Sequence, residues 1–197
     1  MKGKTHLMIG TAAGITLGVN YPLEIAIVII ASSVVGSLLP DIDHPKSSFN
    51  QKILFIKNKL YKTLIYSFIG TAFTYYGSSL NDKLLILLGI TLILTGITNH
   101  RGFTHSLLGL LLYTYIIKKL TIRYDIQGVY IGFVAGYISH LIADFLTKGG
   151  IELFYPFKIN ISSPIKIKSG GFWERFIIKG TSIYSVYILW NHMKIGS

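Results

Sequence analysis

Long apolar runs separated by short polar turns make up most of the chain. Apolar runs that lack internal charges are typical of helices that lie in a lipid bilayer. The pattern predicts helices at residues 5–19, 23–39, 60–80, 84–98, 104–117 and 128–146, and a last interfacial or membrane helix at 176–190. We therefore predict an all-α fold, a polytopic membrane helical bundle with amphipathic interfacial segments.

Turn and small residues indicate how these helices are joined. The turn at Asn20 to Pro22 predicts an antiparallel hairpin of the first two helices. Small residues at every fourth position allow a neighbouring helix to approach closely, and the first helix carries Gly10, Gly14 and Gly18. Residues 49–59 mix lysines with apolar side chains and are interpreted as an interfacial amphipathic segment. Residues 151–168 contain two prolines and predict extended or hairpin structure.

Composition supports a membrane location. The 197 residues are 51% hydrophobic and have a mean hydropathy of +0.54, and no linker is apparent, so we expect a single domain over residues 1–197. The basic and apolar start lacks a small-residue cleavage site, so we expect it to be retained. The net charge of +11 is spread beside the apolar runs, which favours an anionic membrane surface over nucleic acid.

The alternation of helix direction predicts a shared polar end of the bundle. His6, the DIDHP motif at Asp41, the NHRGFTHS motif at Asn99, and His140 with Asp144 all fall on one membrane side. Most basic residues fall there too, including Lys46, Lys59 and Lys62. Positive charge is enriched on the cytoplasmic side of membrane proteins, so we predict a cytoplasmic site.

The acidic motifs offer metal ligands. The chain has no cysteine, so a metal must be held by His, Asp or Glu. His140 and Asp144 are four residues apart and share one helix face. Asp41 and Asp43 alternate across a segment expected to be extended, and their donors suit zinc, manganese or iron. One aspartate could ligate or bridge metals while the other orients a histidine, or both could merely cap a helix-terminal turn.

The NHRGFTHS motif carries two further candidate ligands. His100 and His105 are five residues apart and cannot share a face of one continuous helix. Gly102 predicts a break, and Thr104 is expected to cap the following helix, which places His105 in its first turn. Arg101 is the candidate partner for a substrate anion, with lipid headgroup contact as the alternative.

Two isolated residues complete the candidate set. His6 is predicted to be a ligand because of its placement at the polar end, although a buried and hydrogen-bonded histidine is the alternative. Glu174 follows a glycine pair and could be a general base or a late ligand. A surface ion pair of Glu174 with Arg175 or a lysine is favoured over both.

These motifs together resemble a known family over nearly the whole chain. His6, PDIDHP from Pro40, HRGFTHS from His100 and HLIAD from His140 are similar to the YdjM-like inner-membrane metal-dependent hydrolases. The resemblance implies a hydrolase of unknown substrate and a distant similarity to zinc-dependent phospholipases C.

We thus expect a metal-dependent hydrolase in a bacterial or archaeal cell membrane, cleaving a phosphoester of a lipid or lipid-linked substrate. One or two divalent ions, zinc before manganese or magnesium, would be held by a subset of His6, Asp41, Asp43, His100, His105, His140 and Asp144. Arg101 would bind the substrate anion, and Asp43 or Glu174 would accept a proton from water. The alternatives are a non-catalytic protein with a structural metal and, less favoured, a metal transporter, because the ligands cluster at one end.

Overall fold

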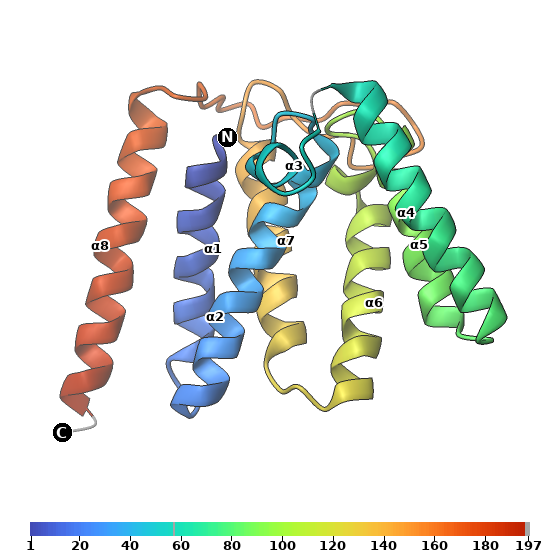
Figure 1. Cartoon of the computed structure of the whole chain (residues 1–197). Coiled ribbons are helices and arrows are strands. Elements are labelled where there is room, and N and C mark those ends of the chain that lie inside the picture. Colours follow the sequence, from blue (N-terminus) through green and yellow to red (C-terminus); the bar gives the residue numbers. More distant parts are fainter. Residues whose placement is uncertain (57, 196–197) are drawn as a thin grey trace. The chain divides into compact units, whose positions relative to one another are not determined.

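The computed structural model describes residues 1–56 and 58–195, and every regular element within them is a helix (Figure 1). The all-α prediction is therefore confirmed. Where the sequence predicts extended or hairpin structure, isolated β-bridges join Thr147 to Ile167 and Ile151 to Ile161. The elements are α1 Gly3–Gly18, α2 Leu23–Leu38, η1 Leu39–Asp43, α3 Ser48–Lys52, α4 Lys59–Ser79, α5 Lys83–Ile97, η2 Phe103–His105, α6 Leu107–Tyr124, α7 Val129–Phe145 and α8 Phe172–Ile195.

One stretch of the described chain is long and apolar enough to cross a membrane, Leu23–Asp43, which comprises α2 and η1. Lys83–Ile97 and Val129–Phe145 are shorter apolar helices. A bundle of several membrane-spanning helices thus stays a prediction, as does the single domain. The chain divides into two compact units: unit 1 contains Met1–Leu39, Thr121–Ile151 and Asn160–Ser197, and unit 2 contains Pro40–Leu120 and Glu152–Ile159.

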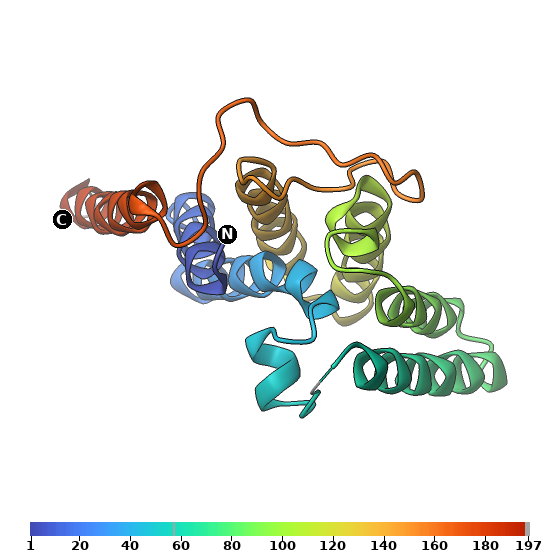
Figure 2. The same ribbon diagram turned by 90° about the horizontal axis from the view of Figure 1, so that it is seen from above.

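Unit 1 is built on the hairpin of α1 and α2, with α7 packed against both helices and α8 along α1 (Figures 1 and 2). The glycines of α1 face α2 closely. A Cβ atom at Gly14 would lie 2.7 Å from Ile30 Cα, and one at Gly10 would lie 2.5 Å from Ser37 Cβ. The predicted hairpin and close approach are confirmed.

The contact between α2 and α7 is closer still. A Cβ atom at Gly132 would lie 2.2 Å from the Ile29 carbonyl oxygen, and one at Gly136 would lie 1.9 Å from the Ser33 carbonyl oxygen. Real side chains cannot approach a backbone oxygen so closely, so only glycine permits this packing. The contact fixes the C-terminal end of α7, which carries the HLIAD motif, against the end of α2.

Unit 2 contains the antiparallel hairpin of α4 and α5 (Figure 1). Asp82 caps the start of α5, where its carboxylate accepts the Leu84 N–H at 2.9 Å. The Tyr113 hydroxyl of α6 lies 2.7 Å from the Thr95 hydroxyl of α5. The second contact joins α5 to α6, and the NHRGFTHS motif is the connection between these two helices.

The structure corrects two local predictions in the motifs. The segment around Asp41 is not extended, because η1 continues α2 as a 3-10 turn through Pro40, which has no N–H group to satisfy. Thr104 does not cap the following helix. The Ser106 hydroxyl accepts the Gly109 N–H at 3.1 Å instead, and the Thr104 hydroxyl is used elsewhere in the motif.

Other segments also differ from their predicted extents, among them α8, which covers Phe172–Ile195 instead of residues 176–190. Helix α6 runs to Tyr124 instead of residue 117. Among its described residues, the predicted amphipathic segment at 49–59 is helical in α3, Ser48–Lys52, and at Lys59, where α4 begins. Phe55 follows with a left-handed φ of 52°, and Lys57 lies outside the described residues.

Candidate metal sites

Asp43 is the centre of the cluster in unit 2. Its side chain is fully buried, and its Oδ1 lies 2.7 Å from His100 Nδ1. Its Oδ2 accepts the Arg101 backbone N–H at 3.0 Å and the Thr104 hydroxyl at 2.7 Å. The Arg101 N–H and the Thr104 hydroxyl both donate to this buried carboxyl group, which is the pattern of an ionised carboxylate that only accepts hydrogen bonds.

This carboxylate fixes the tautomers of two histidines. Because Asp43 can only accept, His100 Nδ1 carries the proton and His100 Nε2 carries the lone pair. His105 Nδ1 lies 3.1 Å from the Thr104 hydroxyl oxygen and 3.4 Å from Asp43 Oδ2. The Thr104 hydrogen is donated to Asp43, so His105 Nδ1 must also be the donor. Metal-binding histidines typically have this arrangement, in which a carboxylate orients the ring and raises its basicity.

Asp41 provides a carboxylate at the other nitrogen of His105. Its Oδ1 lies 3.9 Å from His105 Nε2. Zinc binds nitrogen and oxygen ligands at about 2.0–2.2 Å, so two atoms on one ion can be up to about 4.2 Å apart. Asp41 and His105 therefore fit a shared ion, while Asp43 makes the orienting contacts. The sequence left these two roles unassigned.

Arg101 has a strained backbone at the predicted break. Its φ is 70°, a left-handed conformation that costs a non-glycine residue about 1–2 kcal/mol. Its N–H donates to Asp43, and its carbonyl accepts the Glu152 N–H at 3.1 Å. The contacts on both sides hold Arg101 in this conformation, and the predicted broken junction is confirmed.

His44 has the opposite tautomer. Its Nδ1 accepts the Lys46 backbone N–H at 3.1 Å, so its Nε2 carries the proton. Its ring meets the His100 ring edge-on at a centroid distance of 4.5 Å. Burial and the neighbouring His100 lower the pKa of His44 below its usual range. His44 is therefore suited to donate a hydrogen bond and not to bind a metal through Nε2.

Unit 1 contains a second cluster, formed by His6, His140 and Asp144, and all three side chains are buried. Asp144 Oδ1 lies 3.2 Å from His6 Nε2, and Asp144 Oδ2 lies 3.9 Å from His140 Nε2. The two imidazole rings are stacked with centroids 3.7 Å apart. His140 Nδ1 lies 2.7 Å from the Ser37 carbonyl oxygen, which can only accept, so Nδ1 carries the proton and Nε2 the lone pair.

His6 gives the test of whether this cluster suits a metal. Its side chain is completely buried, and neither ring nitrogen has a hydrogen-bond partner among the described residues. Burying an unsatisfied polar group costs about 1–3 kcal/mol. A metal ion bound at His6 Nε2, beside Asp144, would remove this cost. The N-terminal ammonium of Met1 also contacts Asp144 Oδ1, so this carboxylate already has a cationic partner, and the unpartnered His6 is the residue of the cluster that fits a metal.

Within the described part of the chain, Glu174 is buried and does not form the predicted surface ion pair. Its side chain is 1% exposed and accepts the Lys2 N–H at 2.6 Å, the Thr5 hydroxyl and the Gly170 N–H. Burial alone would raise the pKa of Glu174, but these hydrogen bonds outweigh it and hold the pKa below its usual range. Glu174 thereby anchors the start of α1 directly before His6.

Sequence reasoning did not identify the buried polar residues that support the unit 2 cluster. Lys62, which the sequence places only among the basic residues at the polar end, is 1% exposed, and Asn50 is fully buried. A lone lysine within an apolar run was the available signal for Lys62, because isolated charges in such runs are paired or functional. Asn50 gave no signal of this kind.

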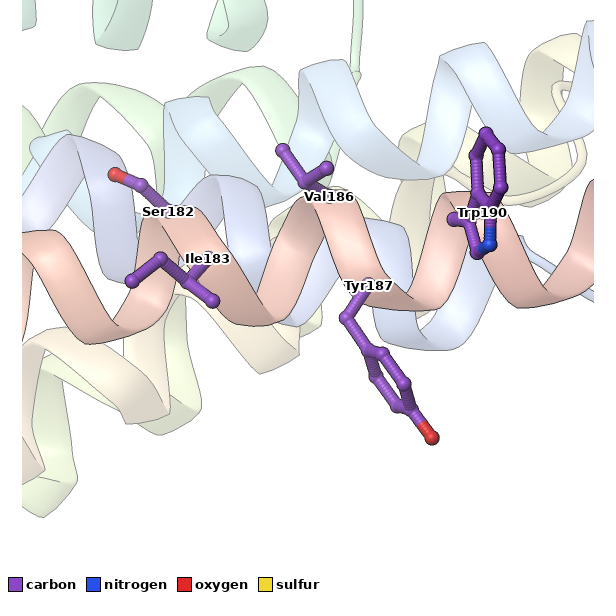
Figure 3. Close-up of a pocket in the computed structure, with 5 residues that line it drawn as sticks. All are labelled: Ser182, Ile183, Val186, Tyr187 and Trp190. Atoms are coloured by element: carbon purple, nitrogen blue, oxygen red, sulfur yellow. The ribbon is translucent and has the colours of Figure 1, made fainter.

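A shallow apolar groove runs along α8 and is lined by Ser182, Ile183, Val186, Tyr187 and Trp190 (Figure 3). None of these five side chains is a histidine, cysteine or carboxylate. The groove is therefore not a candidate metal site.

Comparison with known proteins gives a consistent family. The family described as YdjM inner membrane protein matches residues 1–195. The uncharacterized protein YvsG of Bacillus subtilis (strain 168) is 28% identical over 187 residues, which is 95% of this chain and 93% of YvsG. The inner membrane protein YdjM of Escherichia coli (strain K12) is 32% identical over 163 residues, which is 81% of this chain and 66% of YdjM. No solved structure matches the chain.

Proposed function

This chain belongs to the YdjM inner membrane protein family, and from that premise we propose that it is a metal-dependent hydrolase of the cell membrane. The proposed substrate is a phosphoester of a lipid or a lipid-linked molecule, reached from the cytoplasmic face. The name of the Escherichia coli relative gives an inner-membrane location, and the names of both relatives give no reaction. The proposed reaction therefore rests on the side chains of the two clusters.

The observation that carries the proposal is the arrangement around Asp43. One buried carboxylate sets the Nδ1–H tautomer of His100 and His105, and the Nε2 of His105 lies beside Asp41. Two histidines oriented by one buried carboxylate do not follow from the folding of a surface loop. A carboxylate that orients histidine is typical of metal centres and of His–Asp catalytic pairs.

We assign metal ligands within each cluster. Asp41 and His105 bind an ion in unit 2, and His6, His140 and Asp144 bind an ion in unit 1. Imidazole nitrogen with carboxylate oxygen favours zinc, and manganese or magnesium are the alternatives. A divalent ion bound there would lower the pKa of a coordinated water and polarise a phosphoryl oxygen.

The remaining residues of unit 2 bind the substrate and move the proton. The Arg101 guanidinium binds the phosphoester anion, since it can donate two parallel hydrogen bonds to phosphate. His100 has a side chain that is 30% exposed, and its Nε2 accepts a proton from the attacking water. Asp43 then acts through His100, because it stabilises the imidazolium that forms. Asp43 and Glu174 are positioning residues in this proposal and not the base.

A lipid substrate agrees with the surface of the helices. Large apolar side chains are exposed along α4 and α8, including Phe68, Tyr75 and Val186, as expected of helices surrounded by acyl chains. A substrate in the same bilayer could enter laterally. The basic residues of the loops support the cytoplasmic orientation.

The test combines metal analysis with a hydrolysis screen. Protein purified in detergent should contain a transition metal and should hydrolyse a phospholipid in mixed micelles or p-nitrophenyl phosphate in solution. His105→Ala should abolish turnover and lower the metal content. His192→Ala, which changes an exposed histidine of α8, is the matched control. Metal-free protein, or turnover that His105→Ala leaves unchanged, would refute the proposal.

A structural metal is the second candidate, and the exposure of the site distinguishes it. A structural zinc site is closed, whereas a catalytic site keeps an open coordination position. Asp41 is 22% exposed and His100 is 30% exposed, which favours an open site in unit 2. Full metal occupancy with loss of stability on chelation, but without turnover of any substrate, would favour the structural role.

A further inference from the structure

The backbone carbonyls of the PDIDHP segment accept hydrogen bonds from two buried side chains. Asn50 Nδ2 donates to the Ile42 carbonyl at 2.7 Å and to the His44 carbonyl at 2.8 Å. Lys62 Nζ donates to the carbonyl between them, that of Asp43, at 3.0 Å. Three successive carbonyls of the motif are therefore fixed by two side chains.

Lys62 also reaches the second motif of unit 2. Its Nζ donates to the carbonyls of Thr95 at 3.2 Å and Thr98 at 2.7 Å. These carbonyls lie at the C-terminal end of α5, where helix carbonyls lack intrahelical partners. The NHRGFTHS motif begins at the next residue. One ammonium group thus links the backbone before His100 to the backbone of Asp43.

The surroundings of Lys62 exclude a solvated charge. Its side chain is 1% exposed, and its three ammonium hydrogens match the three carbonyl acceptors. A buried lysine is costly unless it is paired or fully hydrogen-bonded. Tyr66, one turn further along α4, donates its hydroxyl to Asn50 Oδ1 at 2.8 Å. Lys62 and Tyr66 therefore form one network beneath the motif.

We propose that Lys62 is a positioning residue of the unit 2 metal site, which it supports by fixing the Asp43 backbone relative to the end of α5. The proposal rests on the proposed metal-binding function. It makes a distinctive prediction, because Lys62 carries a positive charge. If only electrostatics mattered, its removal would strengthen the binding of a cation. Positioning predicts weaker binding instead.

The experiment is a titration of the detergent-solubilised full chain with Co²⁺, followed by visible absorption. Lys62→Met should weaken Co²⁺ binding by about tenfold or more, the range seen when outer-shell partners of a metal site are removed. Lys59→Met is the charge-matched control, since Lys59 lies on the same helix, is exposed and contacts only the Asn99 side chain among the described contacts. It should leave the affinity unchanged or slightly higher.

Two further variants separate positioning from loss of stability. Thr63→Val removes a hydrogen bond from α4 to the Gly96 carbonyl of α5 without touching the motif, and it should bind Co²⁺ like the wild type. Asn50→Asp replaces the donor to Ile42 and His44 while making the site more negative, and it should also weaken binding. This second variant decides the question if Lys62→Met does not fold.

Several outcomes would overturn the proposal. Equal or tighter Co²⁺ binding by Lys62→Met or Asn50→Asp would do so, as would an equal loss in Thr63→Val. If the wild type binds no Co²⁺, the metal proposal fails by itself. The positioning role of Lys62 is then tested by backbone amide hydrogen exchange in the peptide that contains residues 41–47. Exchange should be faster in Lys62→Met than in Lys59→Met, and equal exchange rates would refute the positioning role.

Discussion

Replacing Asp43 by Asn should keep the structure of the unit 2 cluster while changing the nitrogen of His100 that carries the proton. Asp43 Oδ2 accepts two donors, from Arg101 and Thr104, so the amide oxygen of Asn must take that place. The amide nitrogen of Asn then faces His100 Nδ1, so two N–H donors point at each other and cannot form a hydrogen bond. His100 can relieve this conflict only by moving its proton to Nε2, which removes the lone pair needed to accept a proton.

The expected magnitudes follow from these contacts. Two of the three hydrogen bonds survive, so the variant should fold and lose about 1.5–3 kcal/mol at most, the value of one hydrogen bond to a charged group. Turnover should fall by about 10³ to 10⁴, as expected when a catalytic histidine is held in the wrong tautomer. Metal affinity should fall by about 10- to 100-fold, because an outer-shell carboxylate is lost.

The assay combines ring ¹⁵N shifts of histidine-labelled protein, which report the tautomer, with hydrolysis rates and a Co²⁺ titration. Asp82→Asn makes the same chemical change at the cap of α5, outside the cluster, and should alter none of the three readouts. The reasoning is wrong if His100 keeps its proton on Nδ1 in the Asp43→Asn variant. It is also wrong if turnover survives a change of tautomer.

Three other predictions test the packing, a buried carboxylate and the topology. Gly136→Ala should lower the free energy of unfolding by about 1–3 kcal/mol in a denaturation experiment, because the new methyl group would overlap a carbonyl of α2. Gly180→Ala is the control on α8, where no atom lies within 4 Å of the new methyl group. It should raise the free energy of unfolding by about 0.5–1 kcal/mol. The pKa of Glu174 is lower in the folded than in the unfolded protein, so Glu174 stabilises the fold above the unfolded pKa and loses this effect as pH falls through the folded pKa. The difference in unfolding free energy between wild type and Glu174→Gln should therefore shrink in acid. A difference that does not change with pH would contradict the pKa shift. Cysteines introduced at Lys46 and at Lys148 into this cysteine-free chain should react with an impermeant thiol reagent from the same, cytoplasmic side, and labelling from opposite sides would rule out the alternating topology.

The sequence predicted the helices well because each is an apolar run between turn residues. The boundaries of α2 and α5 lie within one or two residues of the expected ones. The alternation of helix direction also predicted that His6 and Asp144 lie at the same end, as the structure has them in unit 1. These predictions depend on local pattern and on the alternation of helix direction, which a single sequence contains.

The details that failed depend on partners distant in the chain. Thr104 has a good capping sequence, yet its hydroxyl donates to Asp43, 61 residues earlier. Lys62 resembles any interfacial lysine until the carbonyls 33 and 36 residues later are known. Glu174 is held by residues of α1. No local propensity encodes such contacts, and none of these residues lies within a recognisable metal-ligand spacing.

The partner that orients His140 is a backbone atom, and this has a consequence for the variation the protein can tolerate. The Ser37 carbonyl lies in the last turn of α2, so it has no acceptor role within the helix and is available to the imidazole. No substitution at residue 37 can remove that oxygen. Mutational scanning of residue 37 should therefore report the tight packing of its side chain against Gly10. It should not detect the hydrogen bond from His140 to the backbone carbonyl of residue 37.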